Sequence, residues 1–199
     1  MEKGEKIKVA CIGDSITTGY GLSYPKIESY PAVLQSLLGD RYDVKGFGVN
    51  GSTVLRSVPS SYAIMEECEA ALDYCADIVI IELGANDILY IPGMEQEFVR
   101  DYDCLLEAIL ADSPKARLLI SSLTPIVSFS GLSIEEIQLR QGQIQELIKG
   151  IASHHGIQLI DLWTPLKEAL ISQPLLFPDG VHPNKIGAMI IARTIDAYL

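Results

Sequence analysis

The sequence predicts an α/β fold in which five parallel strands form one sheet between two layers of helices. Two observations indicate this fold. Short apolar runs recur along the 199 residues, and each is followed by a stretch in which apolar residues have helical spacing. Runs such as Ile78–Ile81 show no alternation of polar and apolar side chains, which is typical of strands covered on both faces. We therefore expect a doubly wound, flavodoxin-like three-layer α/β/α fold, with residues 1–199 as a single domain.

The strands are predicted from apolar runs of strand length. In chain order these runs are Lys8–Ile12, Tyr42–Phe47, Asp77–Leu83, Ala116–Leu123 and Ile157–Leu162. The second run is weaker than the others. Because the loops that leave the carboxyl ends of parallel strands share one edge of the sheet, we expect a ligand site at that edge. The segments expected at this edge are 13–15, 48–53, 84–87, 124–132 and the loop before the last helix.

The helices are predicted from their caps and from the spacing of their apolar residues. Ser29 and Pro31 open a helix that Gly39 closes, and Asn184 is a good cap for the last helix. Two more helices are predicted from apolar stripes that face the core. The stripes consist of Phe98, Tyr102, Leu105, Leu106 and Ile109 in one, and Ile137, Ile144, Leu147, Ile148 and Ile151 in the other.

Composition narrows the possible partners and surroundings. The net charge of -11 would repel phosphate backbones and anionic lipids, and no basic patch is visible, so nucleic acid is not an expected partner. No apolar run approaches the roughly 20 residues of a membrane helix, so no membrane span is expected. Since the first residues are polar and charged, we expect a cytoplasmic protein, or an exported one if a leader was removed.

Neither a metal nor a cofactor is predicted. The three histidines include the adjacent His154 and His155, which cannot share one helix face, and no spacing typical of zinc ligands occurs. The four cysteines contain no CxxC pair, and we expect them to be reduced.

Ser15, Asp179 and His182 are the candidate catalytic residues. Ser15 directly follows the first predicted strand, although a serine at this place is often only a helix cap. Asp179 and His182 are three residues apart in a loop closed by Pro183. A carboxylate on one ring nitrogen fixes the tautomer and leaves the other nitrogen free to take a proton from a serine hydroxyl. A lone histidine in such a loop is more typically a cap of a turn, but together the three residues favour Ser15 as nucleophile, His182 as general base and Asp179 as the residue that orients it.

An acyl-transfer site also needs donors aimed at the oxygen that becomes negative in the transition state. Asn86 follows the third predicted strand in the segment Gly84–Asp87, and its side-chain amide is one candidate donor. Gly51 follows the second strand, and no Cβ obstructs its backbone N–H. Either residue alone is more typical of a turn. We assign Asp14 and Asp87 to holding their loops by hydrogen bonds, and the role of Glu82 stays open.

Four ordered motifs resemble those of the SGNH hydrolases, also called the GDSL family. They are Gly-Asp-Ser at Gly13–Ser15, the glycine loop 48–53, Gly-x-Asn-Asp at Gly84–Asp87, and Asp-x-x-His-Pro at Asp179–Pro183. The resemblance implies a serine esterase with Ser15, Asp179 and His182 as the triad. It also implies an oxyanion hole formed by the N–H of Ser15 together with Gly51 and Asn86. Ile16 departs from the leucine of the family's first motif, but this change removes no catalytic group.

A dinucleotide-binding protein is a remote alternative. Gly46–Gly51 spells the fingerprint Gly-x-Gly-x-x-Gly after a strand, with acidic residues farther on. The fingerprint requires a helix that opens at its third glycine. The segment from Ser52 to Ser61 is rich in serine and contains Pro59, which disfavours such a helix.

The substrate is predicted less sharply than the reaction. Four aromatic residues offer stacking surface for sugars, namely Tyr20, Tyr24, Tyr90 and Trp163. Together with a resemblance to the carbohydrate esterases of the family in residues 13–30, they favour a small or carbohydrate ester, and removal of O-acetyl groups. A lysophospholipase or thioesterase acting on longer acyl chains is the alternative. It rests on a possible apolar slot made by Leu89, Ile91, Ile126, Val127, Phe129, Leu176 and Phe177.

Overall fold

The computed structural model describes residues 5–199 and confirms the predicted three-layer architecture. Its five strands are all parallel and lie in the order β2-β1-β3-β4-β5, which is the flavodoxin-like order. The strands are β1 (Ile7–Gly13), β2 (Tyr42–Gly48), β3 (Ile78–Glu82), β4 (Arg117–Ser121) and β5 (Gln158–Ile160). β5 is shorter than predicted because its ladder to β4 spans only three residue pairs.

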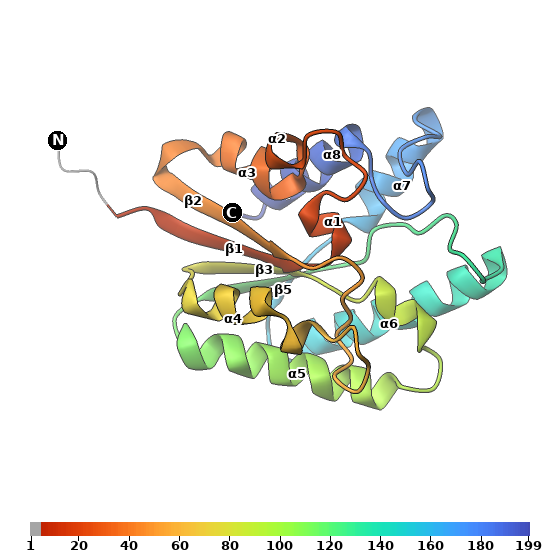
Figure 1. The fold of residues 1–199 in the computed structure, drawn as a ribbon, viewed down its shortest axis with the longest axis horizontal. Helices are drawn as coiled ribbons and strands as arrows, with labels where there is room; N and C mark the ends of the chain where they lie inside the picture. Colours follow the sequence, from red (N-terminus) through yellow and green to blue (C-terminus); the bar gives the residue numbers. More distant parts are fainter. Residues whose placement is uncertain (1–4) are drawn as a thin grey trace.

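Helices cover both faces of the sheet (Figure 1). On one face lie α1 (Ser15–Thr18), α2 (Pro25–Glu28), α3 (Tyr30–Leu38), α7 (Trp163–Ser172) and α8 (Lys185–Asp196). On the other lie α4 (Glu66–Asp73), α5 (Glu95–Asp112) and α6 (Ile134–His154). Three short 3-10 turns complete the set: η1 (Gly39–Arg41), η2 (Tyr62–Ile64) and η3 (Asn86–Leu89).

The predicted helix ends are found where their capping chemistry placed them. α3 begins at Tyr30 and ends at Gly39, whose φ of 71° is readily adopted only by glycine. The side chain of Asn184 accepts hydrogen bonds from the backbone N–H groups of Ile186 and Gly187 in the first turn of α8. Ser133 and Glu136 form a reciprocal capping box at the start of α6, which the sequence analysis did not single out.

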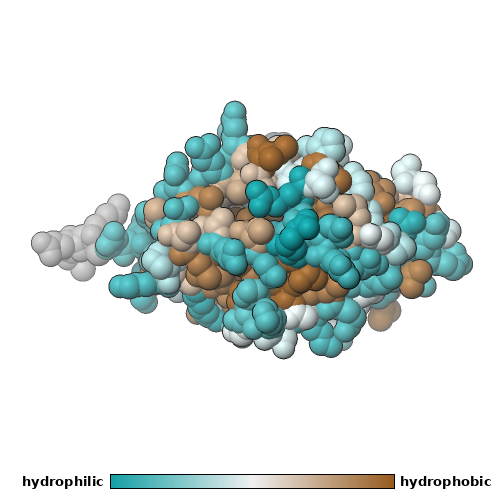
Figure 2. Space-filling model, turned by 90° about the horizontal axis from the view of Figure 1, so that it is seen from below, coloured by the Kyte–Doolittle hydropathy of each residue, from teal (hydrophilic) through white to brown (hydrophobic). Residues whose placement is uncertain are grey.

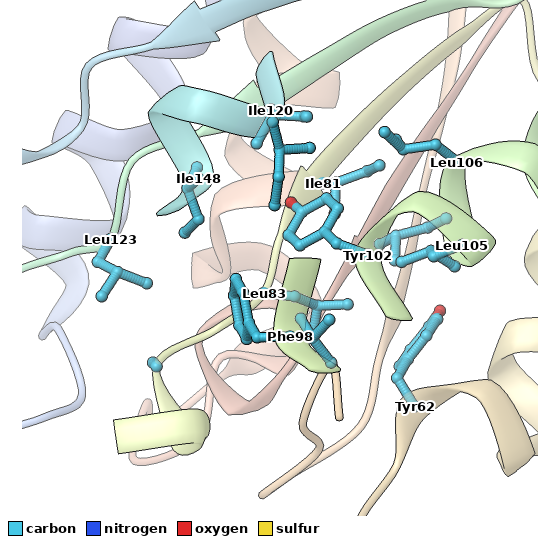
Figure 3. Packing of buried hydrophobic residues seen from close by; sticks show 14 of the residues in the cluster. Tyr62, Ile81, Leu83, Phe98, Tyr102, Leu105, Leu106, Ile120, Leu123 and Ile148 are labelled. Carbon is cyan, nitrogen blue, oxygen red and sulfur yellow. The ribbon is translucent and has the colours of Figure 1, made fainter. Parts of the chain in front are cut away.

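Two hydrophobic clusters hold the layers together, one on each face of the sheet. The larger cluster joins the strands to α5 and α6, and Figure 3 shows Tyr102 of α5 beside Ile81 of β3 and Ile120 of β4, with Phe98 of α5 beside Leu83. The outer surface on this side is largely hydrophilic, with hydrophobic residues visible between the polar ones (Figure 2). The strands are therefore buried on both faces, as their continuous apolar runs predicted.

Three carboxyl groups are buried near the carboxyl edge of the sheet. Asp87 accepts hydrogen bonds from the backbone N–H groups of Val54 and Leu55, so it ties the long loop after β2 to η3. Asp14 caps α1 through the N–H of Ile16. Both Asp14 and Asp87 hold their loops by hydrogen bonds, as predicted.

Burial raises the pKa of all three carboxyl groups. The pKa of Asp14 is raised to about 7 and that of Asp87 to about 6, although the hydrogen bonds that they accept lower both values. Burial raises the pKa of Glu82 well above its ordinary value.

We predict that the free energy of unfolding decreases as the pH rises from about 4 to about 7. An aspartate titrates near pH ~3.9 in an unfolded chain, whereas Asp14 titrates at about 7 in the folded protein. Between these values the folded state holds more protons, so raising the pH weakens folding. The melting temperature should fall by several degrees across this window, and Asp14→Asn should reduce that fall. The exposed Asp40→Asn is the matched control and should keep the wild-type slope. Equal slopes in the wild type and Asp14→Asn would contradict the prediction.

Candidate active site

The five predicted site residues line one cavity of about 500 Å³ at the carboxyl edge of the sheet. We call it the Ser15 cavity, and its lining comprises Ser15, Tyr20, Asn50, Gly51, Asn86, Ser128–Ser130, Asp179, Val181 and His182. The residues come from the loops after β1, β2, β3 and β4 and from the loop before α8. The parallel sheet thus brings together residues that are distant in the sequence, as expected for this edge.

Ser15 is the first residue of α1 and does not cap it. The cap is Asp14, so the hydroxyl of Ser15 is not used for that purpose. Gly13 permits the sharp transition from β1 to α1, because a Cβ at this position would collide with the side chain of Thr17 and the carbonyl oxygen of Glu82. Ser15 is only 7% exposed, and it lines the cavity.

A continuous line of hydrogen bonds joins Ser15 to His182 and Asp179. The Ser15 Oγ lies 2.8 Å from His182 Nε2, and His182 Nδ1 lies 2.6 Å from Asp179 Oδ2. Since an ionised carboxylate can only accept, Nδ1 carries a proton and Nε2 is left to accept the Ser15 hydroxyl. This assignment of the tautomer follows from the partners. The arrangement can move a proton from Ser15 to His182.

The loop that carries His182 is itself fixed by Asp179. Asp179 Oδ1 accepts the backbone N–H groups of His182 at 2.8 Å and of Val181 at 3.0 Å. Partial burial raises the pKa of Asp179, but the hydrogen bonds from His182 and Val181 outweigh it and leave this pKa below its ordinary value. Asp179 therefore stays ionised at neutral pH and can stabilise positive charge on the imidazole.

Tyr20 is a neighbour of His182 that the sequence did not assign to it. Its ring lies 4.6 Å from the imidazole, centroid to centroid, at an interplanar angle of 49°. Its residue surface is 52% exposed, so one part of the ring faces solvent at the cavity. Tyr20 is among the aromatic residues predicted to offer stacking surface, but its contact with His182, 162 positions away, has no local sequence signal.

The three candidate oxyanion donors belong to residues that line the Ser15 cavity. Within residues 5–199, no protein acceptor is found for the backbone N–H of Ser15 or of Gly51. Gly51 adopts a φ of 78° with open space at its Cα. The Asn86 Nδ2 group lies 3.1 Å from Asp14 Oδ2 and 3.0 Å from the carbonyl oxygen of Ser52. Both hydrogens of that amide thus have internal acceptors, and a bound oxyanion would have to share one of them.

The carboxyl group of Glu82 is 1% exposed, and neither oxygen has a hydrogen-bond partner among the described residues. Glu82 pairs in register with Gly13, so it lies beneath the start of α1. Its raised pKa, caused by burial and then by the charge of Asp14, favours the neutral carboxylic acid. Of the two positions open to Glu82, the structure therefore shows the buried one, without a polar partner among the described residues.

The four predicted aromatic residues separate into different places. Tyr20 lines the Ser15 cavity, and Tyr24 lines an adjoining cavity of about 580 Å³ that shares Tyr20, Asp179 and His182 with it. Tyr90 packs against the larger hydrophobic cluster. Trp163 lies along a separate cavity. Only two of the four therefore lie at the candidate site.

The predicted apolar slot is not assembled. Of its seven residues, Phe129 alone lines the Ser15 cavity. Four others are buried in the two hydrophobic clusters, namely Ile91, Ile126, Leu176 and Phe177. Leu89 and Val127 are exposed, and neither lines the Ser15 cavity. The four buried residues therefore contribute to packing of the core.

The glycine loop after β2 does not have the form of a dinucleotide site. In the described chain no helix opens at Gly51, and the next α-helix begins only at Glu66. Over the same residues, no group of three His, Cys, Asp or Glu side chains is placed to hold a metal ion. The helices of residues 5–199 include none with the length and apolar character needed to cross a membrane.

Comparisons with known proteins identify a family model and two curated relatives that are similar to this chain. The model of the GDSL-like Lipase/Acylhydrolase family matches residues 11–190. A relative from Xylanibacter ruminicola, named acetylxylan esterase, is 33% identical over 99% of this chain, which spans 44% of that relative's length. An arylesterase from Vibrio mimicus is 21% identical, with 89% of this chain and 80% of the relative covered.

Solved structures show the same fold. A member of the lipolytic G-D-S-L family from Veillonella parvula superposes with a TM-score of 0.75, over 96% of each chain and at 22% sequence identity. The two curated relatives carry the names of carboxylic ester hydrolases. The match over most of its length shows that this chain belongs to the GDSL-like lipase/acylhydrolase family.

Proposed function

We propose that this protein is a serine carboxylic ester hydrolase that removes O-acetyl groups from carbohydrates. The observation that carries the proposal is the hydrogen-bonded line from Asp179 through His182 to Ser15. This line ends on the hydroxyl of a residue that lines the Ser15 cavity, into which an ester can enter. Ser15 is then the nucleophile, His182 the general acid and base, and Asp179 the residue that orients the imidazole.

In the first step, His182 Nε2 takes the proton of Ser15 as Ser15 Oγ forms a bond to the ester carbonyl carbon. The carbonyl π electrons move to the oxygen, which becomes an oxyanion. The backbone N–H groups of Ser15 and Gly51 and the Asn86 amide are the proposed donors to it. When the intermediate collapses, the bond to the alcohol oxygen breaks, and His182 returns its proton to that oxygen.

The second step clears the acyl group from Ser15. A water molecule gives a proton to His182 Nε2 and attacks the acyl carbonyl carbon. The same donors face the second oxyanion. Collapse breaks the bond to Ser15 Oγ, which regains its proton from His182, and releases the carboxylic acid. Asp179 remains ionised throughout and stabilises the imidazolium of both steps.

Two findings favour an acetylated carbohydrate as the substrate. The relative with 33% identity over almost the whole chain is named acetylxylan esterase. The predicted apolar slot does not extend the Ser15 cavity, because Phe129 is the one residue of that set in its lining and lies between the polar Ser128 and Ser130. A short acyl group suits such a lining better than a long chain, which needs continuous apolar surface.

We predict that Asn86→Ala lowers kcat by about 10²- to 10³-fold, because one donor to the developing charge is lost. KM should change much less. The control is Asn50→Ala, which alters an amide of the same cavity that is not assigned to the oxyanion. Steady-state kinetics on 4-nitrophenyl acetate measure both variants. A raised KM with an intact kcat would make Asn86 a residue of ground-state binding instead.

A second prediction concerns the acyl chain. On 4-nitrophenyl esters, kcat/KM should decrease from acetyl to butyryl to octanoyl, and acetylated xylo-oligosaccharides should release acetate. An extended apolar groove would instead gain about 0.8 kcal/mol for each additional buried methylene group. A steady increase of kcat/KM with chain length would therefore reject the deacetylase and favour the lysophospholipase or thioesterase alternative.

A further inference from the structure

The cavity that adjoins the Ser15 cavity has no role in the steps above. We call it the Tyr24 cavity, and its volume is about 580 Å³. Its lining comprises Tyr20–Tyr24, Glu28, Pro178, Asp179 and His182–Lys185. It lies where the segment between α1 and α2 faces the loop that precedes α8, and α2 contacts α8 (Figure 1). The two cavities meet at Tyr20, Asp179 and His182, which line both of them.

The chemistry of the ester assigns different parts of a substrate to the two cavities. The carbonyl oxygen must face the donors of Gly51 and Asn86, which line the Ser15 cavity and do not line the Tyr24 cavity. The alcohol oxygen must lie within hydrogen-bond reach of His182, because His182 returns a proton to it. Since His182 lies at the border between the cavities, the alcohol portion can extend from there into the Tyr24 cavity.

The lining of the Tyr24 cavity matches a neutral polyhydroxylated ring. Tyr20 and Tyr24 are 52% and 67% exposed, so both offer ring surface to a bound molecule. Glu28 accepts the backbone N–H of Tyr24 through Oε2 at 2.9 Å, and its Oε1 has no partner among residues 5–199. The hydroxyl of Ser23 and the ammonium group of Lys185 add donors. Such sites combine apolar faces with a few polar groups that fix orientation.

The charge of the cavity argues against an anionic alcohol such as a phospholipid headgroup. Glu28 and Asp179 are both in the lining, against the single cation Lys185, and the whole chain carries a net charge of -11. A phosphate group would meet unfavourable electrostatic potential here, whereas a neutral sugar would not.

We infer that the Tyr24 cavity is the subsite for the alcohol portion of the substrate, and that it binds a sugar ring against Tyr24 with Glu28 as a hydrogen-bond acceptor. This inference rests on the proposed function, because it requires attack by Ser15 and protonation of the leaving alcohol by His182. Beyond that function, it identifies the surface that would recognise the carbohydrate. The Ser15 cavity then holds only the acyl group and the oxyanion.

The test compares two acetyl esters that differ in their alcohol portions, an acetylated xylo-oligosaccharide and ethyl acetate. Tyr24→Ala should lower kcat/KM on the oligosaccharide by about tenfold, mainly through KM, because ring contact is lost in the ground state and the transition state alike. It should leave hydrolysis of ethyl acetate unchanged, since the ethyl group is too small to fill the cavity. Tyr24→Phe, which keeps the ring, should retain most of the wild-type value.

Phe129→Ala is the matched control, because it removes an aromatic ring from the Ser15 cavity. Its ratio of kcat/KM on the oligosaccharide to that on ethyl acetate should equal the wild-type ratio. If Phe129→Ala changes this ratio and Tyr24→Ala does not, the sugar lies in the Ser15 cavity and the inference is wrong.

The failure of the inference is distinguishable from the failure of the proposed function. A wild-type enzyme that cleaves both esters, with Tyr24→Ala equal to it on both, refutes the subsite and leaves the deacetylase standing. A wild-type enzyme that cleaves ethyl acetate but no acetylated sugar refutes the carbohydrate substrate, and the subsite with it. A wild-type enzyme that cleaves neither acetyl ester but cleaves 4-nitrophenyl octanoate refutes the deacetylase, and the subsite with it.

Discussion

The hydrogen bond between Ser15 Oγ and His182 Nε2 joins residues 167 positions apart, and the rest of the molecule is arranged so that it can form. Ser15 follows β1, which lies between β2 and β3, and His182 precedes α8, which packs beside α3. The sheet must be buried on both faces for these two loops to meet at one edge. The two hydrophobic clusters meet this requirement, because each fixes one layer of helices against the strands.

Burial at this edge also sets the charge of the site. A fixed negative charge close to the oxyanion would oppose the charge that develops there. Glu82 avoids this conflict because burial favours its neutral form, whereas Asp179 keeps its charge through the hydrogen bonds that it accepts at the cavity surface. Asp14 lies between these cases, since its pKa of about 7 leaves it partly protonated at neutral pH. The charge of each carboxyl group at this edge therefore depends on how deeply it is buried and on the hydrogen bonds that it accepts.

The sequence predicted those features that repeat locally or follow a motif. The apolar runs predicted all five strands, and the motifs predicted which residues would gather around one cavity. The sequence did not predict which aromatic residues lie at the site. Neither Tyr20 nor Trp163 has a local signal for its position, and only the tertiary packing places Tyr20 against His182 and Trp163 along a separate cavity. The prediction of an apolar slot was wrong for a related reason, because loop residues such as Ile126 are buried in the hydrophobic core and do not line the cavity. The acceptors of the Asn86 amide likewise depend on loops brought together only by the fold.

The proposed mechanism requires that Ser15 is the nucleophile and that His182 activates it. Treatment with a 4-nitrophenyl phosphonate ester, followed by intact-mass measurement and peptide mapping, tests this role directly, since an activated serine forms a stable adduct at its Oγ. We expect one adduct per chain, located on Ser15, and no labelling of Ser15→Ala under the same conditions. An adduct on another residue, or labelling of Ser15→Ala at the wild-type rate, would contradict it.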